Sequence, residues 1–142
     1  MFLYRCGLGR ILGHRFLLLI HTGRRSGRRH ETVLEIIEYR SDGPKAVVLS
    51  GFGVVADWFR NIQAVPETEV VVGTRRFSAD HRVLEVNEAV GVWARYEQRH
   101  RLARPLIRLV LNSLLGWRYT GTVEDRQRMA VQLPMVELHL RS

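Results

Sequence analysis

Short apolar segments separated by turn signals recur along the chain, and this pattern constrains the fold more than any other feature. Residues 15–22 (RFLLLIHT) form an apolar run that ends in a glycine-rich loop, as expected of a central strand. Residues 31–40 are rich in β-branched and aromatic side chains, and the turn sequence SDG leads from them to residues 45–51. Residues 68–86 read as strand, Gly-Thr turn and strand. Connections this short join antiparallel neighbours, so the sequence predicts β-hairpins.

Two segments outside these hairpins have their own periods. Residues 56–65 place apolar side chains at i, i+4 and i+7 from Trp58, and Pro66 follows, which predicts a short helix. Residues 131–142 alternate apolar and polar side chains near the C-terminus, which predicts a half-buried strand. Because Pro134 precedes the alternation, we expect this strand to lie at an edge.

Residues 87–117 form the main helical section. Asn87 is its expected N-cap, with Glu88 in the first turn, and Pro105 is expected to open a second helix. A short helix is expected before the first strand. About six mostly antiparallel strands with helices inserted late predict an α+β protein built on a small β-barrel, with residues 1–142 forming one domain.

Positive charge is concentrated near the N-terminus. The chain has 22 basic and 14 acidic residues, a net charge of +8, and all the basic residues except Lys45 are arginine. A genome rich in G and C would also raise the arginine content, but it would not explain the local distribution. The residues that precede Glu31 include arginines and no carboxylate. Arginine binds phosphate and carboxylate through its planar fork, so this distribution favours an anionic ligand.

The loop at residues 21–30 (HTGRRSGRRH) is the densest part of this charge. Its two glycines allow a turn that exposes backbone N–H groups as an anion-binding nest. Further donors would come from four arginines, a serine and a histidine: Arg24, Arg25, Arg28, Arg29, Ser26 and His30. The loop therefore predicts a site for phosphate or a polycarboxylate, and the alternative is a solvated basic hairpin.

Signals of other chemistry are missing from the sequence. There is no nucleophile elbow, no HExxH, no Walker loop and no GxGxxG motif. His21 and His30 flank arginines that would repel a cation, so no metal site is expected. The single cysteine, Cys6, excludes an internal disulfide and fits a reducing compartment. No apolar run reaches roughly 18 residues, so no membrane span is predicted and the cytoplasm is the expected location.

Three segments carry a family resemblance. In order, HTGRRSGRRHETVLEI, VVLSGFG and ADWFRNIQAVPETEVVVGTRRFSADHRVL resemble the deazaflavin (coenzyme F420)-dependent nitroreductase family of actinobacteria over about residues 1–135. The most specific pieces are the T-G-R-[RK]-[ST]-G loop and the W-[YF]-x-N-[LI]-x-x-x-P segment. The resemblance implies a split β-barrel of the FMN-binding and pyridoxamine-oxidase kind with peripheral helices. It also implies coenzyme F420, whose tail carries a phosphodiester and glutamates, with FMN as the alternative cofactor.

The same resemblance implies which residues bind the cofactor. The loop residues match positions that meet the phosphate and tail, although His30 stands where many members have arginine. Asp57 also departs from the apolar residue of some members, so their substrate range does not transfer. The implied cofactor-binding residues are Arg24, Arg25, Ser26, Arg28, His30, Thr32, Ser50, Gly51, Trp58 and Asn61, and Trp58 and Arg60 are the implied substrate contacts.

Hydride transfer is the reaction that this resemblance implies. Reduced F420 would pass hydride to a small organic acceptor such as a quinone, an enone or a nitro compound, and no protein nucleophile is needed. The alternatives are an FMN-binding protein and a basic module that binds nucleic acid or a membrane surface. The low aromatic content, 8%, argues against nucleic-acid binding.

The helix expected at residues 104–118 has an apolar stripe bordered by arginines. The stripe consists of Ile107, Val110, Leu111, Leu114 and Leu115. Such a stripe must be covered by the barrel, by a second subunit or by lipid. We expect it to pack on the barrel or on a second subunit and to close the site near Trp58. Lipid contact would instead place the protein at the inner face of the membrane.

Overall fold

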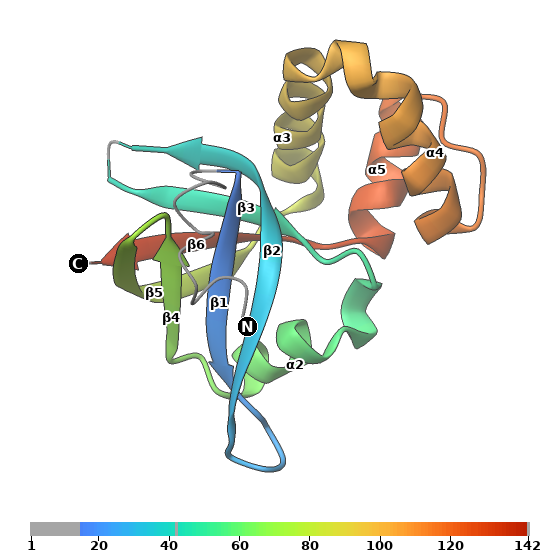
Figure 1. Cartoon of the computed structure of the whole chain (residues 1–142). Coiled ribbons are helices and arrows are strands. Elements are labelled where there is room, and N and C mark those ends of the chain that lie inside the picture. Colours follow the sequence, from blue (N-terminus) through green and yellow to red (C-terminus); the bar gives the residue numbers. More distant parts are fainter. Residues whose placement is uncertain (1–14, 42, 142) are drawn as a thin grey trace.

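The computed structural model describes residues 15–41 and 43–141, and its strands form a closed barrel (Figure 1). The order around the barrel is β1-β2-β3-β6-β5-β4, and every pairing is antiparallel. The α+β barrel expected from the sequence is therefore confirmed. The strands are β1 (Phe16–Thr22), β2 (Arg29–Arg40), β3 (Lys45–Leu49), β4 (Thr68–Val72), β5 (Arg75–Val83) and β6 (Met135–Arg141). The expected N-terminal helix and Cys6 lie outside the described residues.

Alternation along β1 decides what faces the barrel interior. Leu17 and Leu19 belong to the barrel core, whereas Leu18 and Ile20 belong to a separate small cluster. Because successive strand residues point to opposite faces, the same alternation turns His21 inward at the end of the strand. His21 is buried, and this places an imidazole at one mouth of the barrel.

Strand β2 contains a bulge and contributes side chains to two hydrophobic cores. The register with β3 shifts between Ile36 and Glu38. Ile36 belongs to the barrel core and its neighbour Ile37 belongs to the second core, which lies under the helices, because successive strand residues point to opposite faces. The barrel and the helical layer are joined through such outward-facing residues.

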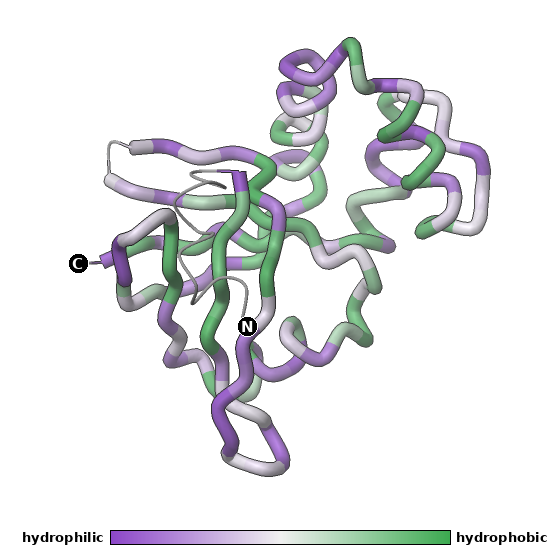
Figure 2. The backbone as a smooth tube through the Cα atoms, viewed as in Figure 1, coloured by the Kyte–Doolittle hydropathy of each residue, from purple (hydrophilic) through white to green (hydrophobic). Residues whose placement is uncertain are grey.

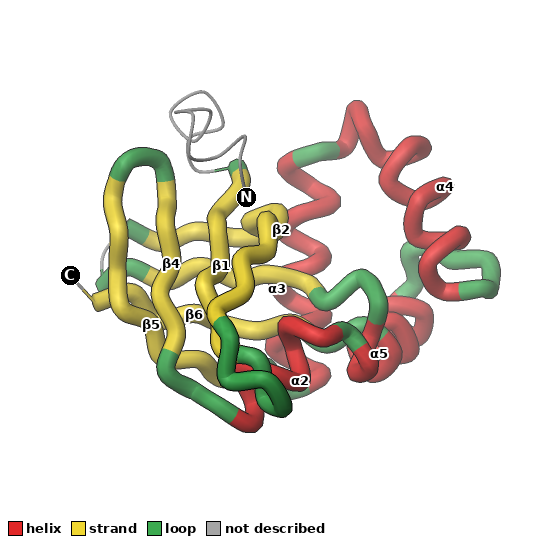
Figure 3. The backbone as a smooth tube through the Cα atoms, turned by 60° about the horizontal axis from the view of Figure 1, so that its bottom comes forward, coloured by secondary structure: helices red, strands yellow, loops and turns green. Residues whose placement is uncertain are grey.

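The helices lie in two places (Figures 1 and 3). The short helix α2 (Asp57–Ala64) follows the 3₁₀ turn η2 (Gly53–Val55) and contributes Trp58, Phe59 and Ile62 to the barrel core. The other helices lie together beside the barrel and pack on its outer surface. They are α3 (Val86–Arg99), α4 (Arg104–Leu115) and α5 (Val123–Gln132), with the 3₁₀ turn η3 (Arg101–Ala103) between α3 and α4.

The expected cap of the helical section is wrong by two residues. The N-cap of α3 is Glu85, whose side chain accepts from the backbone of Glu88 while the Glu88 side chain accepts from the Glu85 N–H. This reciprocal capping box satisfies two helix-end donors, so Asn87 lies inside the first turn. Helix α5 was not expected from the sequence at all. Its N-cap is Thr122, whose hydroxyl accepts from the Asp125 N–H at 3.1 Å.

The expectation of an edge strand near the C-terminus is also wrong. β6 pairs with both β3 and β5, so it is an interior strand of the closed barrel. Pro134 is compatible with this position because it lies just before the first strand residue, Met135. Its carbonyl still accepts a hydrogen bond from the Ser50 N–H, at 2.9 Å.

The apolar stripe expected on α4 is covered only in part. Leu111 and Leu115 are buried in the core under the helices, and Ile107 and Leu114 pack against it. Val110 was expected in the same stripe, but half of its surface is exposed. Nor does the stripe close over Trp58, which belongs to the barrel core instead.

Candidate functional site

The arginine-rich loop is the turn of the β1–β2 hairpin, and it is mostly hydrophilic in Figure 2. Gly27 has a φ of 69°, a conformation that side chains other than glycine rarely adopt. Gly23 is required for a different reason. A Cβ at Gly23 would lie 2.5 Å from Ser26 Oγ and 2.9 Å from His30 Nε2. Both glycines therefore set the tight shape of the loop.

Four backbone amides of the loop already form hydrogen bonds within the protein. The Gly23 N–H donates to the Arg28 carbonyl at 2.8 Å, and the Gly27 N–H donates to the Gly23 carbonyl at 2.9 Å. The Arg28 N–H donates to Ser26 Oγ, and the Arg24 N–H donates to Asn61 Oδ1. These four amides are therefore engaged within the protein, and the charged donors of the loop are its side chains.

Helix α2 is tied to the loop by a chain of polar contacts. Asn61 Oδ1 accepts from the Arg24 backbone at 3.1 Å and from the Arg24 guanidinium at 2.8 Å. The same guanidinium contacts Asp57 Oδ1 at 3.3 Å. Arg24 is thus a structural clamp between the loop and α2, although the sequence had suggested that it binds the ligand.

The series of polar contacts continues through His21 to Thr32. It determines which atom is the donor and which is the acceptor in each hydrogen bond. Since Asn61 Oδ1 accepts from Arg24, the Asn61 amide nitrogen points to His21 Nδ1, at 3.1 Å. His21 Nδ1 is then an acceptor, and its Nε2–H donates to Thr32 Oγ1 at 2.9 Å. The Thr32 hydroxyl has one acceptor position filled, so its hydrogen remains available as a donor.

The protonation of His21 agrees with this arrangement. The pKa of His21 is lowered from 6.5 to about 4, mainly by burial and also by the nearby His30, while Asp57 partly opposes the shift. The ring is therefore neutral near pH 7, as its acceptor role toward Asn61 requires. The His30 ring stacks on it, with ring centroids 5.6 Å apart.

A pocket of about 370 Å³ lies between the loop, β2 and α2. It brings together seven of the ten cofactor-binding residues expected from the sequence: Arg24, Arg25, Ser26, His30, Thr32, Trp58 and Asn61. Gly23, Glu31, Asp57 and His21 complete the lining. Residues from two distant segments of the sequence thus meet in one place.

The remaining expected residues do not line this pocket. Arg28 lies on the exposed part of the loop. Ser50 is fully buried, and its hydroxyl donates to the Gly53 carbonyl at 2.6 Å, so it holds the turn after β3. Gly51 follows it and lies close to α4, since a Cβ there would be 3.7 Å from Leu114 Cδ1. Arg60, an expected substrate contact, is exposed on α2.

Some of the arginines around the pocket form ion pairs with carboxylates, and others do not. Arg24 is paired with Asp57, and Glu31 has Arg29 at 3.9 Å. The exposed side chains of Arg25 and Arg28 form no ion pair with any other residue in the described ranges 15–41 and 43–141. Arg25 lines the pocket together with Thr32, and Arg28 adds a second free guanidinium on the exposed part of the loop, which suits an anion that carries several oxygens.

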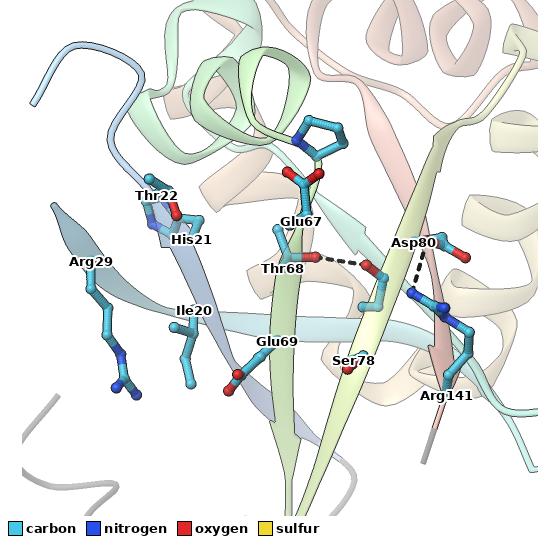
Figure 4. Close-up of a pocket in the computed structure, with 12 residues that line it drawn as sticks. Ile20, His21, Thr22, Arg29, Glu67, Thr68, Glu69, Ser78, Asp80 and Arg141 are labelled. Carbon is cyan, nitrogen blue, oxygen red and sulfur yellow. Dashed lines mark hydrogen bonds and ion pairs between the residues drawn. The ribbon is translucent and has the colours of Figure 1, made fainter. Parts of the chain in front are cut away.

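A larger cavity of about 550 Å³ shares His21 with this pocket (Figure 4). Arg29 and Arg141 lie in its wall together with Glu67, Glu69 and Asp80. Arg141 is already paired with Asp80 at 3.1 Å. The carboxylates outnumber the arginines in this wall, so the smaller pocket is the better site for an anion.

The roles of two residues were not predicted from the sequence: the buried position of His21 and the ion pair of Asp57. The strand alternation Leu17, Leu19, His21 could have placed the imidazole inside the barrel. Nothing in the local sequence could have identified its partner Asn61, which is distant along the chain. Asp57 was noted only as a departure from the family pattern, whereas the structure pairs it with Arg24.

Two other kinds of site were sought in the described part of the chain. No group of three or more His, Cys, Asp or Glu side chains there could hold a metal ion. None of the described helices combines the length and the apolar character needed to cross a membrane.

Comparisons with known proteins agree with the sequence and the fold. A family model described as F420H(2)-dependent quinone reductase matches residues 5–105. No curated protein matches the sequence. A solved F420-H2-dependent reductase is 17% identical, with a TM-score of 0.54 over 89% of this chain and 96% of that one. A pyridoxamine 5′-phosphate oxidase-related FMN-binding protein from Nostoc punctiforme is 15% identical, with a TM-score of 0.56 over 96% and 78%. A chain described as a domain-swapped dimer is 19% identical, with a TM-score of 0.54 over 90% and 82%.

Proposed function

The chain belongs to the F420H2-dependent quinone reductase family and is an F420-dependent oxidoreductase, and we propose that its hydride acceptor is a quinone. The observation that carries this proposal is the span of the family match. Residues 5–105 include both the loop at 21–30 and α2, the two segments that meet in the pocket. The matched family and the pocket therefore concern the same part of the molecule.

The proposed cofactor contacts are made by donor groups that are not already paired within the protein. Arg25 and Arg28 would bind the phosphodiester and the carboxylates of the F420 tail, with Ser26, His30 and the Thr32 hydroxyl as additional donors. Arg24 and Asn61 would hold the loop against α2 so that these donors converge. The fit is supported by the donor set itself, because the unpaired guanidinium of Arg25 in the pocket and that of Arg28 on the exposed loop would suit a tail that is rich in anionic oxygens.

The ring of the cofactor would lie nearer to Trp58 and Gly51. The chemistry that F420 supplies when bound is donation of a hydride from the C5 carbon of its ring. The protein would contribute placement and exclusion of water, which are effective because hydride transfer needs close, aligned reactants. Trp58 supplies an apolar wall fixed by the barrel core, and the Ser50 hydroxyl holds the turn that carries Gly51.

An apolar acceptor is supported by the segment that leads into α2. Phe52, Val54 and Val55 are all well exposed although they are large and apolar. They lie in the few residues between Gly51 and Asp57, beside the proposed ring position. Exposed apolar side chains at such a place suit a hydrophobic acceptor better than a charged one.

The test measures the rate of F420H2 oxidation, which is monitored through the return of F420 absorbance and fluorescence. The rates with quinone, enone and nitro acceptors are compared. The proposal predicts the highest kcat/KM with a quinone that has a hydrophobic substituent. A faster reaction with the nitro compound or the enone would overturn the assignment of the acceptor. Activity with FMN alone would favour the FMN-binding alternative, whose fold is shared by the Nostoc punctiforme protein.

A homodimer is the proposed assembly, by analogy with the structural neighbour that is described as a domain-swapped dimer. The mass of the purified protein by light scattering tests it directly. A mass equal to one chain at all accessible concentrations would exclude the dimer.

A further inference from the structure

Helix α4 exposes several apolar side chains, whereas several of its polar side chains are partly buried. Its polar residues Arg104, Arg108 and Asn112 are partly buried against the protein. Several exposed side chains are large and apolar, with exposed fractions of 97% for Leu102 in η3 and of 63% for Leu106, 66% for Leu109 and 52% for Val110 in α4, and Ser113 is exposed as well. Leu106, Leu109 and Val110 of α4, together with Leu102 of the preceding turn η3, form what we call the outer face of α4.

The helix cannot turn over to bury this face, because its polar residues are fixed inside. Arg108 lies 3.8 Å from Glu97, a carboxylate that is 2% exposed. Glu97 also accepts from the Tyr119 hydroxyl at 2.7 Å and from Arg126 at 3.0 Å. Asn112 accepts from the Tyr119 N–H at 2.7 Å. Rotating α4 would break this network and leave a buried carboxylate short of partners.

A helix that buries Leu111 and Leu115 but still exposes Leu106, Leu109 and Val110 has an apolar surface that favours an occupant on the outer face. Figures 1 and 3 show α4 at the margin of the helical layer, away from the barrel. Almost all of α4 lies beyond residue 105, where the family match ends.

The charge beside this face indicates which occupant it fits. Between Glu97 and Glu124 the sequence contains five arginines and no carboxylate. Arg101 and Arg118 flank the two ends of α4, are exposed, and form no ion pair within the described ranges 15–41 and 43–141. A second copy of the chain on this face would bring the same basic border against itself, whereas an anionic lipid surface complements it.

We propose that the outer face of α4 binds the surface of an anionic membrane, with its leucines in the interfacial region and Arg101 and Arg118 at the lipid headgroups. The membrane contact itself does not depend on the proposed quinone acceptor. The consequence for catalysis does rest on it. Leu114 of α4 lies against Gly51, so the bound membrane would be close to the proposed ring site and to the exposed Phe52. A lipid-soluble acceptor would then be delivered directly from the bilayer.

The experiment is co-sedimentation of the full chain with vesicles of phosphatidylcholine alone or of equal parts phosphatidylcholine and phosphatidylglycerol. The test variant is the double substitution Leu106→Gln and Leu109→Gln, which alters only exposed side chains. Val123→Gln is the matched control, because Val123 is an exposed apolar residue on α5. Thermal melting of each variant confirms that the fold is retained.

The proposal predicts that the wild type and Val123→Gln bind the mixed vesicles and bind phosphatidylcholine alone far more weakly. The leucine double variant should lose on the order of tenfold in partition coefficient for each leucine. Replacing Arg101 and Arg118 with glutamine should reduce binding to the mixed vesicles and its sensitivity to salt. Failure of the wild type to bind the mixed vesicles would overturn the proposal, as would unchanged binding of the leucine variant.

Light scattering on the same samples tests the rival occupant. If the wild type is a dimer and the leucine variant is a monomer, the outer face is a contact between two copies and the membrane proposal is wrong. The F420H2 assay with a water-soluble quinone separates this result from the proposed function. Its rate should be equal in the wild type and the leucine variant, whatever the vesicles show.

Discussion

The buried imidazole of His21 predicts a specific loss of stability in acid. Its folded pKa is about 4, and its ordinary value is 6.5. A histidine that is held neutral in the folded state stabilises it fully above the unfolded pKa. This contribution is lost as the pH falls from about 6.5 toward 4, because the unfolded chain binds the proton more readily. From these two values, linkage gives a loss of about 2 kcal/mol in the free energy of unfolding between about pH 7.5 and about pH 5.

The assay is urea unfolding at these two pH values, for the wild type and for His21→Gln, which cannot titrate. Burial also lowers the pKa of His81, partly opposed by Asp80, so His81→Gln is the matched control. The loss on acidification should be about 2 kcal/mol smaller in His21→Gln than in the wild type. An equal loss in these two proteins would refute the argument that His21 is buried and neutral.

Three further predictions concern the pocket and α4. Arg25→Ala should weaken F420 binding by about 1.5–3 kcal/mol in a fluorescence titration, and Arg76→Ala is the control. If Arg25→Ala binds F420 as tightly as the wild type, the loop binds something else. If His30 donates to the tail, His30→Ala should weaken F420 binding in the same titration. An affinity equal to that of the wild type would remove His30 from the site. Leu111→Asp should lower the free energy of unfolding by several kcal/mol, because Leu111 is 2% exposed; an unchanged melting temperature would contradict the packing of α4.

The β-strands were predictable because their signals are local. Alternation, β-branched residues and turn sequences lie within each segment, and they located the barrel strands without knowledge of their partners. The closure of the barrel was less accessible, since it depends on the pairing of β6 with β3 and β5, far apart in the sequence. Pro134 suggested an edge strand because proline cannot donate a backbone hydrogen bond within a sheet. It lies one residue before β6, however, where no such donor is needed.

The candidate site was predictable in composition but not in the roles of its residues. The loop at 21–30 and the segment around Trp58 were identified from motifs, and the structure brings them together. Arg24 and Arg25 look equivalent in the sequence, yet Arg24 is committed to Asn61 and Asp57 while Arg25 is free. The same limit applies to α4, where the partner of Arg108 is a buried carboxylate on another helix. Only the tertiary structure shows which arginines are uncommitted.

The central claim is that the pocket between the β1–β2 loop and α2 binds F420 through its anionic tail. The most direct measurement is a fluorescence titration of the purified protein with F420, with the deazaflavin ring that lacks the tail, and with FMN. The account predicts saturable binding of F420, much weaker binding of the tail-less ring, and a loss of this difference in Arg25→Ala. Equal affinity for F420 and the tail-less ring, or tighter binding of FMN than of F420, would contradict it.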